Sequence, residues 1–292
     1  MLLSSMRRNR TGIVLLAGLL IGGSAGAGGP ASPGFRLWDS AWPKEKKLEI
    51  ANVAVIGGMA AYGLLFWGYG GHAFQVVNER WFQRDSIHGG ADKLGHAFST
   101  YVAAMSFGDV YERWGYDRRE ASLYGALSGF ATFFMIEFGD AFSRHGFSFQ
   151  DLAADGIGAL WGYLRRECPA LRGLVDYRVS YWPSWGTWRG YTSDFISDYS
   201  GFKYLLAFKG SGIKGLSSTW LRCAEFHLGY YTRGYENQDW CHYGEPHRKV
   251  YVGVALNLSD LLKQRNWRKS GTFLEYYQPP FIDLSQGFDL DN

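Results

Sequence analysis

The sequence contains little cysteine: only Cys168, Cys223 and Cys241 among 292 residues. No pair has C-x-x-C spacing and the count is odd, so a structural zinc site is not expected. No cysteine lies near the N-terminus, which argues against a lipid-modified N-terminal cysteine. In an oxidising compartment one pair could form a disulfide. Cys223 and Cys241 flank a predicted hairpin and are the candidate pair; three free thiols are the alternative.

Familiar catalytic fingerprints are missing as well. The chain has no G-x-S-x-G, H-E-x-x-H, P-loop or G-x-G-x-x-G motif. Each of these motifs places a nucleophile, a metal or a phosphate cradle at a fixed point of a fold. Their absence argues against the enzyme classes that carry them.

The first 27 residues have the three parts of a secretory signal peptide. An arginine-rich start (7–10) precedes an uncharged apolar stretch (11–21) and the small residues (25–27) that a signal peptidase reads. The apolar stretch is too short to span a bilayer. We therefore predict export to the periplasm or cell envelope by a cleaved signal peptide. An uncleaved N-terminal anchor is the alternative.

An excess of positive charge is also missing once this segment is removed. The full chain has 30 basic and 27 acidic residues, and without the signal arginines Arg7, Arg8 and Arg10 the two counts are equal. A nucleic-acid partner would require a basic face. We therefore expect no nucleic-acid partner.

The remaining pattern predicts an α+β fold in which an N-terminal bundle of about four apolar helices precedes a C-terminal antiparallel sheet. We expect a linker at 28–46, a helical module at 47–168 and a β-rich module at 169–292. Period 3.6 predicts helices over 50–67, 92–114, 117–144 and 147–166. Period two predicts strands over 201–209, 221–235, 249–258 and 272–277, weaker ones within 177–196, and a loose C-terminal end.

The first predicted helix, Ile50 to Trp67, carries no charge over 18 residues. This is the shortest run that could cross a membrane. A buried helix in a bundle explains it equally well. The chain also has 12 Trp and 19 Tyr, residues that suit a thick core or a membrane interface.

Ionisable residues stand where the helical pattern calls for apolar ones. The residues are Asp92, Lys93 and His96 in the second predicted helix, Glu137 and Asp140 near the end of the third, and Asp151 and Asp155 at the start of the fourth. Spacings of three and four residues place the members of each group on one helix face. Antiparallel helices with short loops would gather all the groups at one end of the bundle.

Carboxylates gathered in a desolvated place must share protons, pair with cations or bind a metal. The cluster could hold one divalent metal ion, with His96, Glu137, Asp140 and Asp151 as ligands. In a metal-assisted hydrolase of this kind, Asp92 or Asp155 would be the base. Alternatively, two of the acids could form a general acid/base pair, with Lys93 biasing their pKa values. The cluster could also be a salt-bridge and capping network without chemistry, in which Asp92 and Asp151 are helix caps.

These motifs carry a resemblance. Asp92-Lys93-x-x-His96, Glu137-x-x-Asp140 and Ser148-x-x-Asp151 with Asp155 resemble the YfiM-like family of predicted periplasmic lipoproteins of unknown function. The resemblance covers about residues 50–165 and implies an envelope location without established chemistry. A more distant pattern is similar in VanZ-like membrane proteins.

Two functions therefore remain open from the sequence. The first is a membrane-associated envelope protein with a structural or binding role, its partner being a membrane lipid or another envelope protein. The second is a metal-assisted hydrolase that acts on an envelope lipid or glycan through the Asp/His/Glu cluster.

Overall fold

The computed structural model describes residues 41–191, 198–235 and 239–291. The predicted signal peptide and most of the predicted linker lie outside these residues. The first described helix, α2 (Lys44–Tyr62), begins three residues inside the predicted linker and continues into a π-helical turn, η1 (Gly63–Trp67).

The helical half confirms the predicted α part of the fold. Its elements are α2, η1, β1 (Val76–Val77), α3 (Ala91–Arg113), α4 (Arg118–Asp140), β2 (Phe147–Ser148), α5 (Phe149–Glu167) and α6 (Pro169–Leu174). Asp117 and Glu120 form a reciprocal capping box that starts α4. Pro169 follows α5 and cannot continue it, so the chain turns there into α6.

Small residues let α3 lie very close to both α4 and α5. A Cβ added at Gly158 of α5 would lie 2.2 Å from the carbonyl oxygen of Ala97, and one at Gly125 of α4 would lie 2.6 Å from the backbone nitrogen of Gly108. Neither position could carry a larger residue without moving a helix. Helix α3 is therefore held between its two neighbours by backbone contact.

The C-terminal half is a five-stranded antiparallel meander in the order β3-β4-β5-β6-β7. The strands are β3 (Val175–Tyr181), β4 (Phe202–Lys209), β5 (Ala224–Arg233), β6 (His247–Leu256) and β7 (Leu284–Asp289). The connections contain α7 (Trp185–Trp188), η2 (Tyr199–Gly201), η3 (Gly210–Gly212), η4 (Trp220–Cys223), α8 (Trp240–Tyr243), α9 (Leu258–Gln264) and α10 (Arg268–Phe273). Sequential pairing confirms the predicted antiparallel sheet.

Two strand predictions near the C-terminus are wrong. Residues 272–277, predicted as a strand, contain the end of α10, and only Tyr277 makes an isolated bridge, to Val179. The C-terminal end, predicted to be loose, instead forms β7. This strand pairs with β6 in a register that places Leu284 opposite Val254 and Asp289 opposite Lys249. The segment 272–277 was misjudged because one turn of helix and a short strand are hard to distinguish by periodicity.

The predicted Cys223–Cys241 disulfide is also wrong, because both thiols are free. Cys223 immediately precedes β5 and Cys241 follows it in α8. The ten residues of β5 span roughly 33 Å at about 3.3 Å per residue, so the two cysteines lie near opposite ends of one strand. They flank a strand, whereas a disulfide would require both at the same end of a hairpin.

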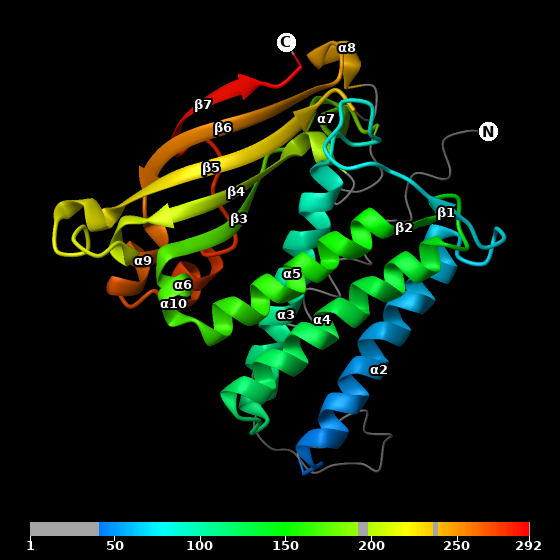
Figure 1. Ribbon diagram of the computed structural model, residues 1–292, viewed down its shortest axis with the longest axis horizontal. Helices are drawn as coiled ribbons and strands as arrows, with labels where there is room; N and C mark the ends of the chain where they lie inside the picture. The colour runs from blue at the N-terminus through cyan, green and yellow to red at the C-terminus, as the bar shows by residue number, and fades with distance from the viewer. Residues whose placement is uncertain (1–40, 192–197, 236–238, 292) are drawn as a thin grey trace.

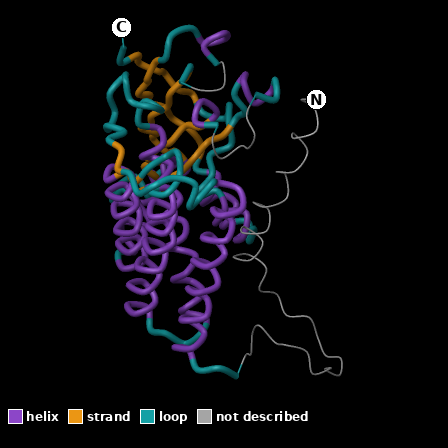
Figure 2. The backbone as a smooth tube through the Cα atoms, turned by 90° about the vertical axis from the view of Figure 1, so that its right-hand side faces the viewer, coloured by secondary structure: helices purple, strands orange, loops and turns teal. Residues whose placement is uncertain are grey.

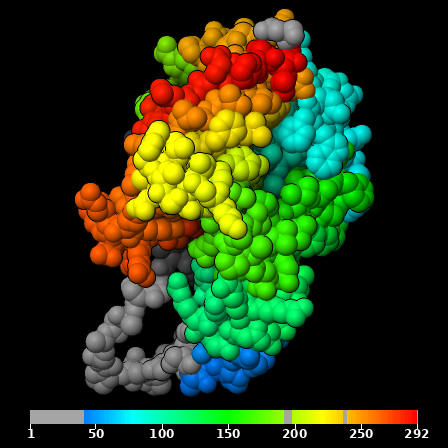
Figure 3. Space-filling view, turned by 60° about the vertical axis from the view of Figure 1, so that its left-hand side comes forward, coloured from blue at the N-terminus to red at the C-terminus, as the bar shows by residue number. Residues whose placement is uncertain are grey.

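The two halves share one hydrophobic core. Tyr101 and Met105 of α3 cluster with Tyr177 of β3 and Tyr204 of β4. Figure 1 shows α3 running behind α4 and α5 toward the sheet, with α2 at the outer edge beside α4. The helices form one end of the molecule and the strands the other (Figure 2). In the space-filling view β7, in red, lies along β6 above the green helices (Figure 3).

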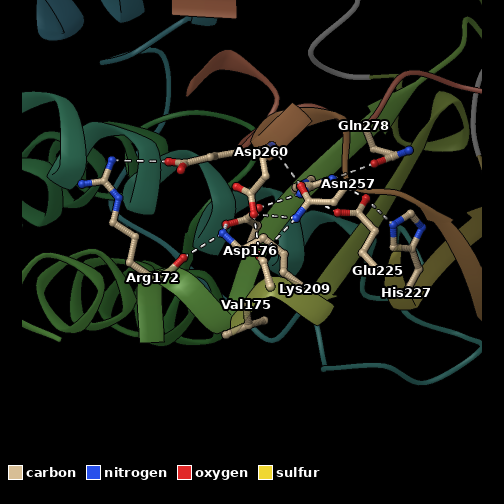
Figure 4. A network of polar contacts seen from close by, with 12 residues as sticks. Arg172, Val175, Asp176, Lys209, Glu225, His227, Asn257, Asp260 and Gln278 are labelled. Carbon is tan, nitrogen blue, oxygen red and sulfur yellow. Dashed lines mark hydrogen bonds and ion pairs between the residues drawn. The ribbon is translucent and has the colours of Figure 1, made fainter. Parts of the chain in front are cut away.

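A buried ionic network lies at one end of the sheet (Figure 4). Asp176 of β3 is fully buried and pairs with Arg165 at 3.0 Å, Arg178 at 2.6 Å and Lys209 at 2.9 Å. Burial alone would raise the pKa of Asp176, but the three cations outweigh it and hold the pKa below its ordinary value. Arg178 continues the network to Glu225, which also contacts His227 at 2.9 Å.

Within the residues that the structure describes, two helical stretches are long and apolar enough to cross a membrane. They are Lys44–Trp67, with a mean hydropathy of 1.7, and Arg118–Asp140, with 1.3. In the most apolar part of each stretch, 6% of the first is buried, compared with 44% of the second. Helix α2 therefore carries an apolar surface that the described protein leaves open.

Because α3 and α5 lie so close together, replacing a glycine by alanine should destabilise the protein at their contact but not on the open face of α2. We expect Gly158→Ala to lower the free energy of unfolding by about 1–3 kcal/mol, because the methyl group would overlap the Ala97 carbonyl. Gly57→Ala in α2 is the control, since nothing lies within 4 Å of its added Cβ. It should be neutral or stabilising by up to about 1 kcal/mol. Urea unfolding of both variants measures this, and equal effects would contradict the packing.

The Asp176 network predicts an acid-sensitive sheet. Asp176→Asn should destabilise the protein by about 3–5 kcal/mol, because it leaves three buried cations short of one charge. Since the folded pKa is lowered, this stabilisation is present above the ordinary pKa of aspartate and is lost as the pH falls toward the folded value. Asp85→Asn, which breaks an exposed pair with Arg80, should cost less than about 1 kcal/mol. The test is to measure the free energy of unfolding of the wild type and of Asp176→Asn at neutral and at acidic pH. The wild type should lose more stability on acidification than Asp176→Asn, and an equal loss would contradict the prediction.

Candidate functional site

The predicted ionisable cluster forms where three helix ends meet. The start of α3 supplies Lys93 and His96, the end of α4 supplies Glu137, and the start of α5 supplies Asp151 and Asp155. The short parallel pair of β1 with β2 aligns Val77 with Ser148. This pairing brings the residues after β1 beside the start of α5.

Lys93 is the centre of one half of the cluster. Its ammonium group is buried and lies 2.6 Å from Asp92 and 2.8 Å from Asp151, and it also pairs with Glu79. Burial alone would lower the pKa of Lys93, but the charges of Asp92 and Asp151 raise it above its ordinary value. Lys93 is therefore a fixed cation that neutralises part of the acidic charge.

His96 is the centre of the other half. Its Nδ1 lies 3.2 Å from Asp155 Oδ1, which also accepts a hydrogen bond from Thr100 Oγ1 at 2.8 Å. Its Nε2 faces Glu137 Oε1 at 3.8 Å and Asp151 Oδ1 at 4.0 Å. The ring is thus oriented from one side and faces two carboxylates on the other.

Burial and crowding change the protonation of this half. Burial raises the pKa of Glu137 to about 8, although His96 opposes the shift. Burial alone would lower the pKa of His96, but the hydrogen bond with Asp155 and the nearby carboxylates outweigh it and raise the pKa to about 10. Both groups therefore retain protons at neutral pH when no other cation balances the carboxylates.

Ser148 caps α5 differently from the predicted capping box. Its hydroxyl accepts from the Asp151 backbone N–H at 3.2 Å. Its own N–H donates to Glu137 Oε2 at 3.2 Å, so a carboxylate from α4 completes the cap in place of Asp151. Asp151 is thereby free to face Lys93 and His96.

The structure brings together six of the seven predicted site residues: Asp92, Lys93, His96, Glu137, Asp151 and Asp155. Asp140 lies in neither of the two groups with metal-ligand spacing, and its recorded side-chain contact is with Ser143 at 3.3 Å. Burial still raises the pKa of Asp140, to about 6. Glu79 was not predicted, because it stands in an irregular segment where no helical spacing relates it to Lys93.

The cluster contains more acid than base. Two triads have ligand atoms within 4.8 Å of one another: His96, Glu137 and Asp155, and Glu79, Asp92 and Asp151. Five carboxylates therefore face Lys93 and His96. Asp155 is completely buried, and its Oδ2 has no hydrogen-bond partner in the described residues. A buried anionic oxygen without a partner is costly, so the arrangement favours an additional proton or cation.

One known family matches the part of the chain that contains the cluster. Residues 78–167 match the model of a family described as "Predicted periplasmic lipoprotein (DUF2279)". This stretch includes every residue of the cluster, from Glu79 to Asp155. It supports a periplasmic or envelope location and leaves the activity open. No curated protein and no solved structure matches the chain.

Glu137 serves both as a cap and as a member of the charged cluster, and two variants separate these roles. Glu137→Ala removes the acceptor for the Ser148 N–H and should cost about 1–3 kcal/mol of unfolding free energy. Glu137→Gln keeps a carbonyl acceptor for the Ser148 N–H and is uncharged, as protonated Glu137 is at neutral pH, so it should cost clearly less. Chemical denaturation of the two variants measures the difference, and equal losses would show that the cap contributes nothing.

Proposed function

We propose that the protein is an exported, membrane-associated envelope protein that binds one divalent metal ion in its helical half. The observation that carries this proposal is the geometry at His96, whose Nε2 lies 3.8 Å from Glu137 Oε1 and 4.0 Å from Asp151 Oδ1 within a cluster that contains more acid than base. The family match supports the compartment. The resemblance to the YfiM-like family rests on the same residues and fits the proposal.

His96 Nε2, Glu137 and Asp151 are the proposed ligands. Two ligands about 2.0–2.2 Å from one ion lie roughly 3–4 Å apart, and Nε2 lies 3.8 and 4.0 Å from the two carboxylate oxygens. Asp155 holds Nδ1, as carboxylates commonly do for metal-binding histidines. Lys93 pairs with the same Asp151 oxygen, Oδ1, that faces His96, so the ion would share this oxygen with the ammonium group.

This ligand set supports metal-assisted hydrolysis of an envelope lipid or glycan phosphate as the activity. A divalent ion with three protein ligands keeps a position for water and lowers the pKa of that water. Asp155 then orients His96, and Asp92 fixes Lys93. A bound ion would lower the pKa of the water, and Asp92 or Asp155 would be the base that accepts its proton.

A structural or binding role without chemistry is the second candidate. Two observations favour it. Lys93 already pairs with the three carboxylates of one triad, Glu79, Asp92 and Asp151. Ser148 also makes two helix-capping hydrogen bonds, one to Glu137 and one from the Asp151 N–H. In that case the cluster fixes the helix ends, and the partner is a membrane lipid or another envelope protein.

Metal analysis of the purified protein separates the candidates. We expect about one equivalent of a divalent metal in the wild type and its loss in Asp151→Asn and Glu137→Gln, because each variant removes a ligand charge. Asp140→Asn is the matched control on α4 and should retain the metal. A chelator should lower the melting temperature of the wild type and of the control only. Metal-free protein that is indifferent to chelators would refute the site.

The protons held by the cluster predict how metal affinity depends on pH. Glu137, with a pKa of about 8, and His96, with one of about 10, must lose their protons to become ligands. Affinity should therefore increase as the pH rises from neutral toward these values. Competition titration with a metal indicator at several pH values measures this. An affinity independent of pH would mean that these groups do not bind the ion.

A further inference from the structure

A cavity of about 450 Å³ lies where the end of α2 meets the loop after α4. Its lining consists of Phe66, Trp67, Gly68, Gly71, His72, Arg144 and His145. The loop that supplies Arg144 and His145 connects α4, which carries Glu137, to β2 and α5. The cavity is separate from the carboxylate cluster in its lining.

The walls of the cavity are fixed to one another. The ring of Tyr69 fills the space beside Gly63 of η1 and Gly139 of α4, where added Cβ atoms would lie 2.0 Å from it. Its hydroxyl donates to the Ile136 carbonyl at 3.1 Å. The His72 N–H then donates to the Phe142 carbonyl at 3.1 Å. These contacts join the turn after α2 to the loop that carries Arg144.

The polar part of the lining is basic. Arg144, His72 and His145 supply the ionisable groups of the cavity, and the lining contains no carboxylate. Arg144 makes no ion pair with the described residues, and its recorded polar contact is Nε to His145 Nε2 at 3.4 Å. Burial and the charge of Arg144 lower the pKa of His145, so Arg144 supplies the permanent positive charge of the lining. A guanidinium group beside imidazole N–H donors suits an anion with several oxygens, of which a phosphate group is the common biological case.

An uncharged apolar surface begins at the edge of the cavity. Phe66 lines the cavity and is 51% exposed, and the neighbouring Leu64 and Leu65 are 63% and 75% exposed. The uncharged run 50–67 has 18 residues, which is roughly 27 Å of helix, close to the ~30 Å of a bilayer's hydrocarbon core. Outward residues of α4 extend the same kind of surface, with Leu127 at 55% exposure and Phe138 at 43%.

We propose that this cavity binds the phosphate headgroup of a glycerophospholipid whose acyl chains lie along α2. A lipid combines the two required chemistries: an anionic headgroup for Arg144 and hydrocarbon for the exposed face of α2 and η1, whose Phe66 lines the same cavity as Arg144. The inference rests on the proposed membrane association and adds a headgroup site to it.

Vesicle flotation tests the proposal with full-length protein transferred from mild detergent. One set of vesicles consists of digalactosyldiacylglycerol, which has no phosphate, and the other contains added phosphatidate. The wild type should bind both sets and bind the second more tightly. Arg144→Gln should reduce the preference for phosphatidate about fivefold and keep the binding to glycolipid. Leu65→Glu should lose binding to both sets.

The controls are Arg265→Gln, an exposed arginine of the other half, and Leu284→Glu on β7, where the leucine is 80% exposed. Both should bind as the wild type does. Equal affinity for the two vesicle sets, or a preference unchanged in Arg144→Gln, would overturn the headgroup site and leave the membrane association intact. Failure to bind either set would overturn both. If the protein bound soluble glycerol 3-phosphate through Arg144 but showed no preference between the vesicle sets, the cavity would be a site for a free anion. If the protein formed a dimer and did not bind vesicles, the apolar face would be an interface with a second copy. Either result overturns the proposal.

Discussion

The backbone contact of α3 with α4 and α5 is the constraint on which the rest of the structure depends. Because Gly158 has no side chain, α5 can lie against the Ala97 carbonyl, and this contact places His96 beside Asp155. Gly125 makes the corresponding approach of α4 possible. The same small residues that close the bundle therefore determine which ionisable groups meet at its end.

Close packing of acidic groups away from water has an energetic consequence that divides the cluster into two halves. Lys93 is a permanent cation with three carboxylate neighbours. Asp92 Oδ1 in its half and Asp155 Oδ2 in the half of His96 are both buried without a hydrogen-bond partner among the described residues. The two halves meet at His96 Nε2, which faces Glu137 and Asp151, and this is where a cation from solution would enter.

Sequence patterns predicted the features that depend on local spacing. Period 3.6 gave four helices, and spacings of three and four residues placed Asp92, His96, Asp151 and Asp155 at one end of the bundle. Local spacing does not predict Glu79, because the pairing of β1 with β2 that positions it joins segments about 70 residues apart in the sequence. The Cys223–Cys241 disulfide failed because a hairpin was assumed where a single long strand separates the two residues. Asp140 shares a helix face with Glu137 but is directed to Ser143, which is a matter of side-chain packing.

The loop between α4 and β2 connects the two polar centres of the helical half. It leaves α4 just after Glu137, carries Arg144 and His145 to the basic cavity, and returns at Ser148 to begin α5. The loop is also hydrogen-bonded to the turn after α2. The same segment therefore contacts the end of α2, the basic cavity and, through the Ser148 N–H, Glu137 of the cluster. The family match, which spans 78–167, includes the loop and the cluster but neither α2 nor the turn after it, so only one side of the contact between the loop and that turn lies in the matched part of the chain.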